Sequence, residues 1–346
     1  MNERPSAKGI AVALVLGCVL TVFAAEGVLR LVMPHWREFY SGWFMQTTDV
    51  QNHGTVTTGR PGFDGYFAQN NGDFRIHIRV NDFGLRNPDP VDKARDSVWF
   101  VGDSMTFGWG VEQKEIYSSV AGHSLNFPTY NVASPGANVC GYQALMARMP
   151  DGARPRAVIV GLILENDIAA YDCRKAAREV RSAKKTSSTG LKVFLTRNTA
   201  LYNFFAVSLK RVGFIRDALS AFGIIAKEHT YTRVLSDSGM AAATKRTAAE
   251  IEVIRNALPA GIPFAVLVVP ARFEIRDGDA FYRKLRQSML AALAKRDIPA
   301  IDPVKAFTGA GFEPTHFAHD GHWSPLGHAL AGQSAAEWLR RQGIGN

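Results

Sequence analysis

Three residue types that nucleophilic catalysis needs occur in short polar segments of this chain. A serine hydroxyl attacks poorly until a neighbouring base takes its proton, and a histidine base needs a carboxylate that holds its tautomer. Ser104 supplies a nucleophile, His322 a base, and Asp320, two residues earlier, a carboxylate. This combination predicts attack on an ester and an acyl-serine intermediate.

These residues belong to four polar segments that follow predicted strands or precede the last predicted helix. From residue 97 onward, short apolar strands alternate with helices, which favours a parallel sheet covered on both faces. In an open parallel sheet, sites form at the carboxyl ends of the strands. Four segments are therefore expected to meet at that edge: Gly102–Thr106, Asn131–Asn138, Glu165–Asp167 and Asp320–Pro325.

Apolar runs and side-chain periodicity define the elements that position these segments. The predicted strands are Phe74–Val80, Ser97–Val101, Pro128–Val132, Ala157–Leu162, Phe264–Val269 and Ala300–Asp302. Helices are predicted at Lys114–Leu125 and Gly141–Met149, and a stripe that recurs every four residues marks another, at Phe281, Leu285, Met289 and Leu293. Ser324 and Pro325 are typical of a helix start, and the last helix is predicted to carry three apolar residues on one side, Leu326, Leu330 and Trp338.

In this order, the four segments resemble the sequence blocks of the SGNH (GDSL-type) hydrolase superfamily, whose name refers to its Ser, Gly, Asn and His. The resemblance covers roughly residues 78–340 and includes the run Asn81–Arg86, which often precedes the first block in exported bacterial members. It implies a three-layer α/β/α, flavodoxin-like fold with a mainly parallel five-stranded sheet. It also implies a serine hydrolase whose oxyanion hole is formed by Ser104 N–H, Gly136 N–H and the Asn166 side-chain amide.

Two departures from the family pattern affect these assignments. Glu165 stands where many members have glycine before the asparagine, which adds a carboxylate near the substrate. One residue separates Asp320 from His322, whereas many relatives have two. The shorter spacing, with Trp323 after the histidine, resembles the polysaccharide O-acetylation branch, which transfers acyl groups as well as hydrolysing them. Glu165 and Asp167 remain alternative partners for the imidazole.

Structural interpretations exist for several of these residues. Ser104 alone would be read as a helix cap, and Trp323 is expected to pack in the core or to stack on a sugar. Three further histidines flank His322, namely His316, His319 and His328. Their spacing fits no helical pair of metal ligands around a carboxylate, so we expect no metal and no cofactor.

The N-terminal region predicts a membrane segment. Gly9–Ala25 contains 17 uncharged, mostly apolar residues, and the apolar pattern resumes after Glu26. The first run alone spans about 25 Å, against a hydrocarbon core of about 30 Å. Arg4 and Lys8 precede it, which favours an inside N-terminus and an exported remainder. A cleaved signal peptide, a lipoprotein modified at Cys18 and a buried core helix are the alternatives.

These observations give a predicted domain organisation. Residues 1–8 are a cytoplasmic N-terminus, 9–33 a transmembrane signal anchor, 34–96 a juxtamembrane segment and 97–346 an SGNH-like domain, with a helical insertion at about 173–260. The expected location is the bacterial inner membrane, with a single span and with the catalytic domain in the periplasm or outside the cell.

Composition and charge limit the class of protein and the kinds of binding partner that we expect. The chain has 346 residues, of which 47% are hydrophobic and 21% charged, which excludes a disordered chain, a collagen and a coiled coil. The net charge of +9 is concentrated between residues 173 and 246, which hold 15 basic and 4 acidic residues. We expect a solvated helical face there, and anionic lipid or an acidic glycan as a partner rather than nucleic acid.

The three cysteines exclude some further classes of site. No two of them have the spacing of a zinc ribbon or a thioredoxin-type motif. Cys140 and Cys173 fall just after the second and third strand ends, and the sequence leaves open whether they form a disulfide or remain two buried thiols.

Together these features predict an anchored serine esterase acting on O-acylated, in particular O-acetylated, envelope or exported carbohydrate, or on a small ester. An O-acyltransferase of polysaccharide modification is the nearest alternative, with envelope polysaccharide-modification proteins as partners. A lipolytic or thioester-cleaving enzyme and a non-catalytic glycan-binding scaffold of an envelope assembly are more distant ones.

Overall fold

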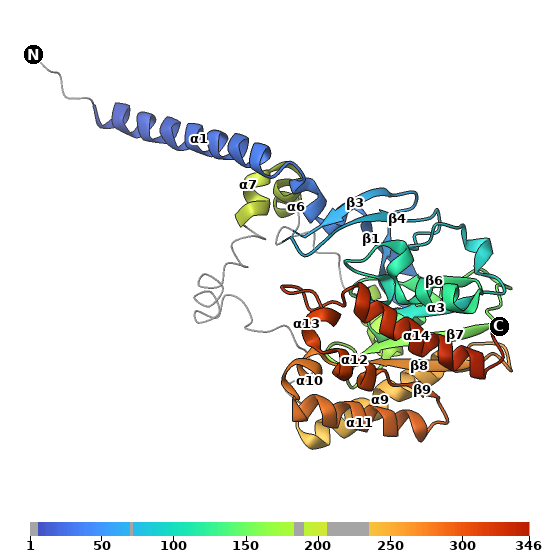
Figure 1. The fold of residues 1–346 in the computed structure, drawn as a ribbon. Coiled ribbons are helices and arrows are strands. Elements are labelled where there is room, and N and C mark those ends of the chain that lie inside the picture. Colours follow the sequence, from blue (N-terminus) through green and yellow to red (C-terminus); the bar gives the residue numbers. More distant parts are fainter. Residues whose placement is uncertain (1–5, 70–71, 183–189, 206–234, 346) are drawn as a thin grey trace, which may run out of the picture. The chain divides into compact units, whose positions relative to one another are not determined.

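The computed structural model describes residues 6–69, 72–182, 190–205 and 235–345, which Figure 1 shows as a ribbon. These residues form two compact units. As far as they are described, residues 1–40, 68–72 and 186–228 make up the N-terminal unit, and residues 41–67, 73–185 and 229–346 make up the main unit.

A five-stranded sheet forms the centre of the main unit. Its strands are β5 (Val98–Gly102), β6 (Thr129–Ala133), β7 (Ala157–Ile163), β8 (Phe264–Val269) and β9 (Ala300–Ile301). Their order is β6-β5-β7-β8-β9, and every neighbouring pair is parallel. This is the flavodoxin-like order, in which the chain changes direction across the sheet between β5 and β7. The predicted fold class is confirmed.

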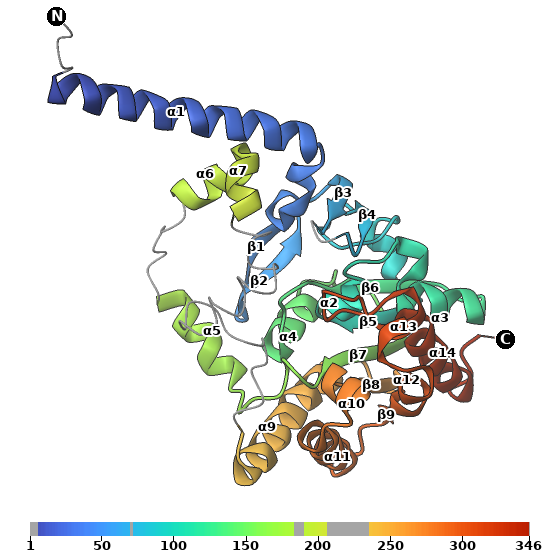
Figure 2. The same ribbon diagram turned by 60° about the vertical axis from the view of Figure 1, so that its left-hand side comes forward.

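Helices cover both faces of this sheet and give the predicted three layers (Figures 1 and 2). One face packs against α4 (Val139–Ala147), α9 (Asp237–Asn256) and α11 (Ala280–Ala294). The other packs against α3 (Tyr117–Leu125), α12 (Val304–Ala310) and α14 (Pro325–Arg341). Val101 and Phe100, neighbours on β5, face opposite cores, as the two-residue period of a strand requires.

Two small two-stranded sheets precede the central sheet. β1 (Met45–Val50) pairs antiparallel with β2 (Gly54–Gly59), and β3 (Asp64–Ala68) pairs with β4 (Arg75–Arg79). Apolar residues of β4 pack with aromatic residues into a third core that includes Phe67, Phe74 and Phe107. Shorter elements complete the main unit: α2 (Ser104–Phe107), α5 (Cys173–Ser182), α10 (Arg272–Asp277), α13 (Phe312–Thr315), and 3₁₀ turns at Ser41–Trp43, Val91–Ala94 and Gln113–Glu115.

Two sequence predictions differ from the structure in detail. The helix predicted to start at Lys114 begins at Tyr117, because Ile116 has an extended backbone (ψ 136°) after a 3₁₀ turn. Leu326 is exposed, because the buried face of α14 is formed mainly by small residues and Trp338.

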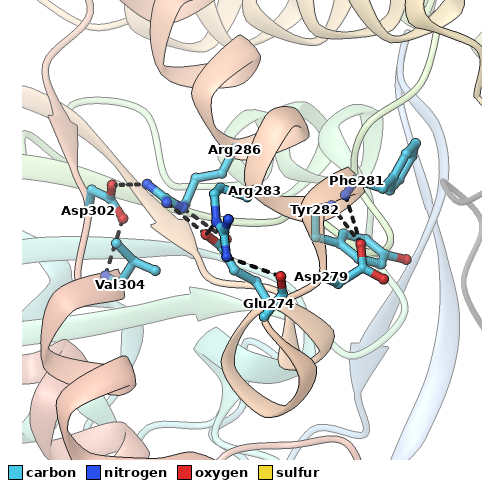
Figure 3. A network of polar contacts seen from close by, with 9 residues as sticks. Glu274, Asp279, Phe281, Tyr282, Arg283, Arg286, Asp302 and Val304 are labelled. Atoms are coloured by element: carbon cyan, nitrogen blue, oxygen red, sulfur yellow. Dashed lines mark hydrogen bonds and ion pairs between the residues drawn. The ribbon is translucent and has the colours of Figure 1, made fainter.

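An ion-pair network holds the β9 edge of the sheet (Figure 3). Arg286 of α11 donates to the Glu274 carboxylate at 2.7 and 2.9 Å and to Asp302 at 2.7 Å. Asp302 follows β9 and accepts the backbone N–H of Val304 at 3.2 Å. Charge-assisted, bidentate bonds of this kind are strong and directional. They fix α10 against α11 and the start of α12, and Arg272 on α10 borders the site described below.

A disulfide joins α4 to α5. It links Cys140 to Cys173, whose Cα atoms are 5.1 Å apart and which are 33 residues apart in the sequence. Of the two states that the sequence leaves open, the structure has the disulfide. Cys18 is the free cysteine, and it lies on the N-terminal helix.

Reduction of this disulfide is expected to destabilise the main unit. Closing a loop of this length lowers the entropy of the unfolded chain and contributes about 3 to 4 kcal/mol. The double variant Cys140→Ser/Cys173→Ser should therefore unfold at a lower urea concentration than the parent, in detergent-solubilised full chain. Cys18→Ser, which removes the exposed thiol, is the control. Equal midpoints for the double variant and the parent would contradict a stabilising bond.

The N-terminal unit is built on α1 (Ala7–Val32). An 18-residue window within the span Lys8–Val32 has a mean hydropathy of 2.3, and most of its apolar side chains are exposed. A helix of this length and composition can cross a membrane, and a signal sequence meets the same criterion. The unit also contains a 3₁₀ turn at Trp36–Phe39, α6 (Gly190–Asn198) and α7 (Ala200–Asn203). An apolar N-terminal helix and a disulfide are both typical of chains that leave the cytoplasm.

Candidate active site

The structure brings Ser104, His322 and Asp320 together. Ser104 is the first residue of α2, directly after β5, and its Oγ lies 2.8 Å from Nε2 of His322. The other ring nitrogen, Nδ1, is hydrogen-bonded to Asp320 Oδ1, which also accepts the His322 backbone N–H at 3.2 Å. A carboxylate only accepts, so Nδ1 carries the proton and the lone pair of Nε2 faces the serine hydroxyl. This is the arrangement of a nucleophile, a base and an orienting acid.

A closed loop holds the histidine in place. Residues 316 and 323 form an antiparallel bridge, and the N–H of Phe317 donates to the carbonyl of His322 at 3.0 Å. Ser324 then caps α14, as predicted, by accepting the N–H of Gly327. A side chain at Gly321 would collide with the guanidinium of Arg272. A larger residue at this position would therefore require the Arg272 side chain to move.

The predicted oxyanion-hole residues lie at the same edge of the sheet as Ser104. β6 and β7, which flank β5, end just before Gly136 and Asn166. Gly136 is exposed with φ +76°, a conformation that favours glycine, and a Cβ there would meet no atom within 4 Å. The side chain of Asn166 is exposed, and among the described residues it has no hydrogen-bond partner. Both groups are accessible to a ligand.

The other two carboxylates considered for the imidazole have different partners. Glu165 accepts the backbone N–H of Arg272 at 2.7 Å and is ion-paired with its Nε at 3.1 Å. Asp167 accepts the Tyr142 hydroxyl at 2.6 Å and the N–H of Ile163 at 2.8 Å. Only Asp320, of these three, is hydrogen-bonded to the His322 ring. Arg272 is a site residue that the sequence pattern did not indicate.

Asp103, which immediately precedes Ser104, and Asp167 are two buried carboxyl groups that interact with one another. Asp103 caps α2 by accepting the N–H of Met105 at 3.0 Å, and both residues are almost fully buried. Burial raises the pKa of Asp167 to about 7. Burial, and then the nearby charge of Asp167, raise the pKa of Asp103 well above its usual range. Two such carboxyls resist ionising together.

The raised pKa values of Asp103 and Asp167 predict how the free energy of unfolding depends on pH. An acid with a higher pKa in the folded than in the unfolded chain holds more protons when folded, so its stabilising contribution is lost as pH rises through the folded value. Asp103→Asn removes one such acid and keeps an oxygen that can cap α2. Its unfolding free energy, relative to that of the parent, should increase between pH 4 and pH 7, because the parent loses the contribution of Asp103 over this range and the variant does not. A constant difference across urea titrations at these two pH values would contradict the prediction.

An aromatic residue that the sequence analysis did not single out packs against His322. The ring of Trp109 is stacked on that of His322, with centroids 5.7 Å apart and planes 29° apart. The backbone N–H of Trp109 donates to the carbonyl of Ser104 at 3.0 Å, which fixes the turn after α2. The indole therefore packs against one face of the imidazole. Trp323, by contrast, is fully buried in the core, 4.9 Å from the Phe307 ring.

The three flanking histidines lie in different surroundings. His316 is stacked on Phe312, and burial lowers its pKa to about 4. His328 accepts the N–H of Tyr117 at 3.3 Å, and burial lowers its pKa to about 3. Both are therefore neutral core residues at neutral pH. His319 is exposed and contacts a different segment of the chain.

That contact joins the β3–β4 segment to the loop that carries Asp320 and His322. The nearly buried carboxylate of Asp73 accepts the backbone N–H of His319 at 3.1 Å and is bonded to its Nδ1 at 2.8 Å. Beside it, the rings of Phe74 and Phe317 pack 5.3 Å apart. His319 immediately precedes Asp320, so Asp73 restrains the backbone that carries the orienting acid.

Removal of this restraint is expected to slow turnover. Asp73→Ala should lower the kcat for a small acetyl ester about tenfold, which corresponds to roughly 1.4 kcal/mol. Asp64→Ala is the control, because Asp64 also pairs with a histidine, His77, whose Nε2 lies 2.5 Å from Asp64 Oδ1. Within the described residues, Asp64 has no contact with the loop that carries Asp320 and His322. Equal rates for the two variants, with equal thermal midpoints, would contradict a positioning role for Asp73.

Comparisons with known proteins find distant similarities to solved structures. No protein-family model matches this chain, and no curated protein matches it. A G-D-S-L family lipolytic protein from Veillonella parvula has a TM-score of 0.39 at 14% identity, over 71% of this chain and 98% of its own. A lipase/acylhydrolase from Enterococcus faecalis has a TM-score of 0.41 at 12% identity, over 71% of this chain and 96% of its own. A carbohydrate esterase family 2 enzyme from Corynascus thermopiles has a TM-score of 0.41 at 15% identity, over 74% of this chain and 68% of its own. This chain is thus structurally similar to SGNH-type lipolytic hydrolases and esterases, at an identity too low to transfer the role of any residue.

Proposed function

We propose that this protein is a serine-dependent O-acyl esterase of the SGNH type. The observation that supports this most is the 2.8 Å contact between Ser104 Oγ and His322 Nε2, with Asp320 on the opposite ring nitrogen. The imidazole takes the hydroxyl proton as Oγ attacks the ester carbonyl, and then gives that proton to the departing alcohol. Water attacks the acyl-serine in the second half of the reaction and releases the acid.

The negative oxygen of the tetrahedral intermediate needs preorganised donors. We assign them to the Ser104 N–H, the Gly136 N–H and the Asn166 side-chain amide. The exposure of Gly136 and Asn166 at the strand ends beside β5 supports this assignment. Loss of one such donor typically costs about 3 kcal/mol of transition-state stabilisation.

The proposed substrate is an O-acylated, above all O-acetylated, carbohydrate of the cell envelope or an exported polysaccharide. The Trp109 ring beside the base supports a substrate with flat apolar faces, such as a sugar ring. The apolar α1 and the Cys140–Cys173 disulfide support an exported location. We propose that α1 is an uncleaved signal anchor in the bacterial inner membrane and that the main unit acts in the periplasm or outside the cell.

The Asp320–Gly321–His322 spacing favours a second candidate, an O-acyltransferase of polysaccharide modification. In that reaction a sugar hydroxyl, instead of water, attacks the acyl-serine, and His322 takes the proton of the sugar hydroxyl. The first half of the reaction, and therefore the role of Ser104, is the same. The partners of a transferase would be other envelope polysaccharide-modification proteins.

One experiment separates these functions. Detergent-solubilised full chain is incubated with a small acetyl ester, with and without acceptor oligosaccharides, and products are identified by mass spectrometry. Free acetate in both reactions supports the esterase, and acetylated oligosaccharide supports the transferase. No turnover by folded protein, in either reaction and over a panel of acetylated glycans, would contradict both and leave the glycan-binding scaffold.

A further inference from the structure

A charged residue inside the apolar helix α1 has specific partners in the N-terminal unit. The Glu26 carboxylate is hydrogen-bonded to Arg30, one turn further along, at 2.7 Å. It also accepts the backbone N–H groups of Ala200 and Leu201, at 2.9 and 2.8 Å. Arg30 in turn donates to the carbonyl of Asn198 at 2.8 Å. Glu26 and Arg30 thus attach the junction of α6 and α7 to α1.

The position of Glu26 along α1 sets the depth of this junction in a bilayer. The uncharged run Gly9–Ala25 covers about 25 Å at 1.5 Å per residue, close to the thickness of the hydrocarbon core. If α1 spans the membrane, Glu26 and Arg30 lie at its outer boundary, where charged groups remain hydrated. The segments bonded to these two residues lie at the same level.

The α6–α7 segment exposes large apolar side chains at this level. Leu191 and Phe194, one turn apart on α6, are 72% and 58% exposed, and Phe205, just after α7, is 53% exposed. The opposite side of the segment is packed, because Ala200 and Asn203 are fully buried. Val28 and Leu31, which flank Glu26 and Arg30 on α1, are also exposed. Water is a poor solvent for such a surface, whereas the headgroup–acyl boundary is a good one.

We propose that α6 and α7 lie in the outer interface of the membrane and insert Leu191, Phe194 and Phe205 into its lipids. The lipid bilayer is the occupant of this face because the segment is hydrogen-bonded to the proposed span at Glu26 and Arg30, at the level of the membrane boundary. The α6–α7 segment, within the predicted insertion, thereby acts as a second membrane contact beside the anchor. This inference rests on the proposed role of α1 as a transmembrane anchor.

Depth-dependent quenching tests the inference in the full chain. In a Cys18→Ser background, a bimane label is placed at Phe194→Cys, at Val19→Cys in the middle of α1, or at Val253→Cys on α9. Val253 is a matched control, since it is an apolar residue of the main unit with 47% exposure. Each protein is reconstituted into nanodiscs of phosphatidylethanolamine and phosphatidylglycerol that contain lipids brominated near the headgroup or near the end of the acyl chain.

The label at position 194 is expected to lose about half of its fluorescence with the shallow bromolipid and less with the deep one. The label at position 19 should show the reverse order, and that at position 253 should lose none. An unquenched label at 194, with 19 quenched, would overturn the interfacial position and leave the anchor intact. Unquenched labels at both 19 and 194 would overturn the anchor itself. Energy transfer between the labels at position 194 of two chains, without bromolipid quenching, would show that a second copy of the chain, and not lipid, covers this face.

Discussion

Replacement of Ser104 by alanine is expected to abolish turnover of an activated acetyl ester. The substitution removes the hydroxyl that lies 2.8 Å from the His322 base, and none of the other described residues is hydrogen-bonded to that Nε2. Loss of a triad member ordinarily lowers the rate by orders of magnitude, since the members act as a unit. The measurement is the initial rate of ester hydrolysis by the purified full chain, at several substrate concentrations.

The fold should tolerate this change. Asp103, not Ser104, caps α2, so the substitution removes no cap. The thermal midpoint of Ser104→Ala is therefore expected to match that of the parent, which separates loss of chemistry from loss of structure. A rate within about threefold of the parent would remove Ser104 from the role of nucleophile.

The second large effect is expected for Asp320→Asn. An amide in this place can present its NH₂ group to the ring and hold the imidazole in the wrong tautomer. In the serine-protease triad, the corresponding Asp-to-Asn change lowers kcat about 10⁴-fold. A fall of about 10³-fold or more is expected here, and KM should change far less than kcat.

The nearby carboxylates supply the comparison for this variant. Glu165→Gln and Asp167→Asn alter the Arg272 and Tyr142 contacts without touching the His322 ring in the described structure. They are expected to retain more activity than Asp320→Asn. If Asp320→Asn keeps most of the parent rate while either of the others loses it, another carboxylate orients the imidazole.

The strands and the proposed triad could be predicted from the sequence because their signals are local. β7 and β8 are continuous apolar runs, which a strand buried on both faces requires, and the structure moves their predicted ends by at most one residue. Ser104 and His322 could be placed near one another because each lies in a polar segment next to a regular element. The order of parallel strands then brings those segments to one edge.

The supporting residues could not be predicted, because their roles depend on contacts between distant segments. Asp73 and His319 are 246 residues apart, and Glu165 and Arg272 are 107 apart. Trp109 had a weaker local signal, since it follows the αL glycine Gly108 that turns the chain back toward Ser104. The packing of α9 could not be predicted for a similar reason, because its mixed sequence does not reveal that Ile251 and Ile254 face the sheet.

The most direct test of the central claim is the mass of the protein during turnover. Full chain is mixed with a small acetyl ester, quenched in acid within the first turnovers, and examined by intact-mass measurement and peptide mapping. The account predicts a species heavier by one acetyl group, with the modification on Ser104 and absent from Ser104→Ala. Hydrolysis of the ester with no such species, or an acetyl group on another residue that persists in Ser104→Ala, would contradict it.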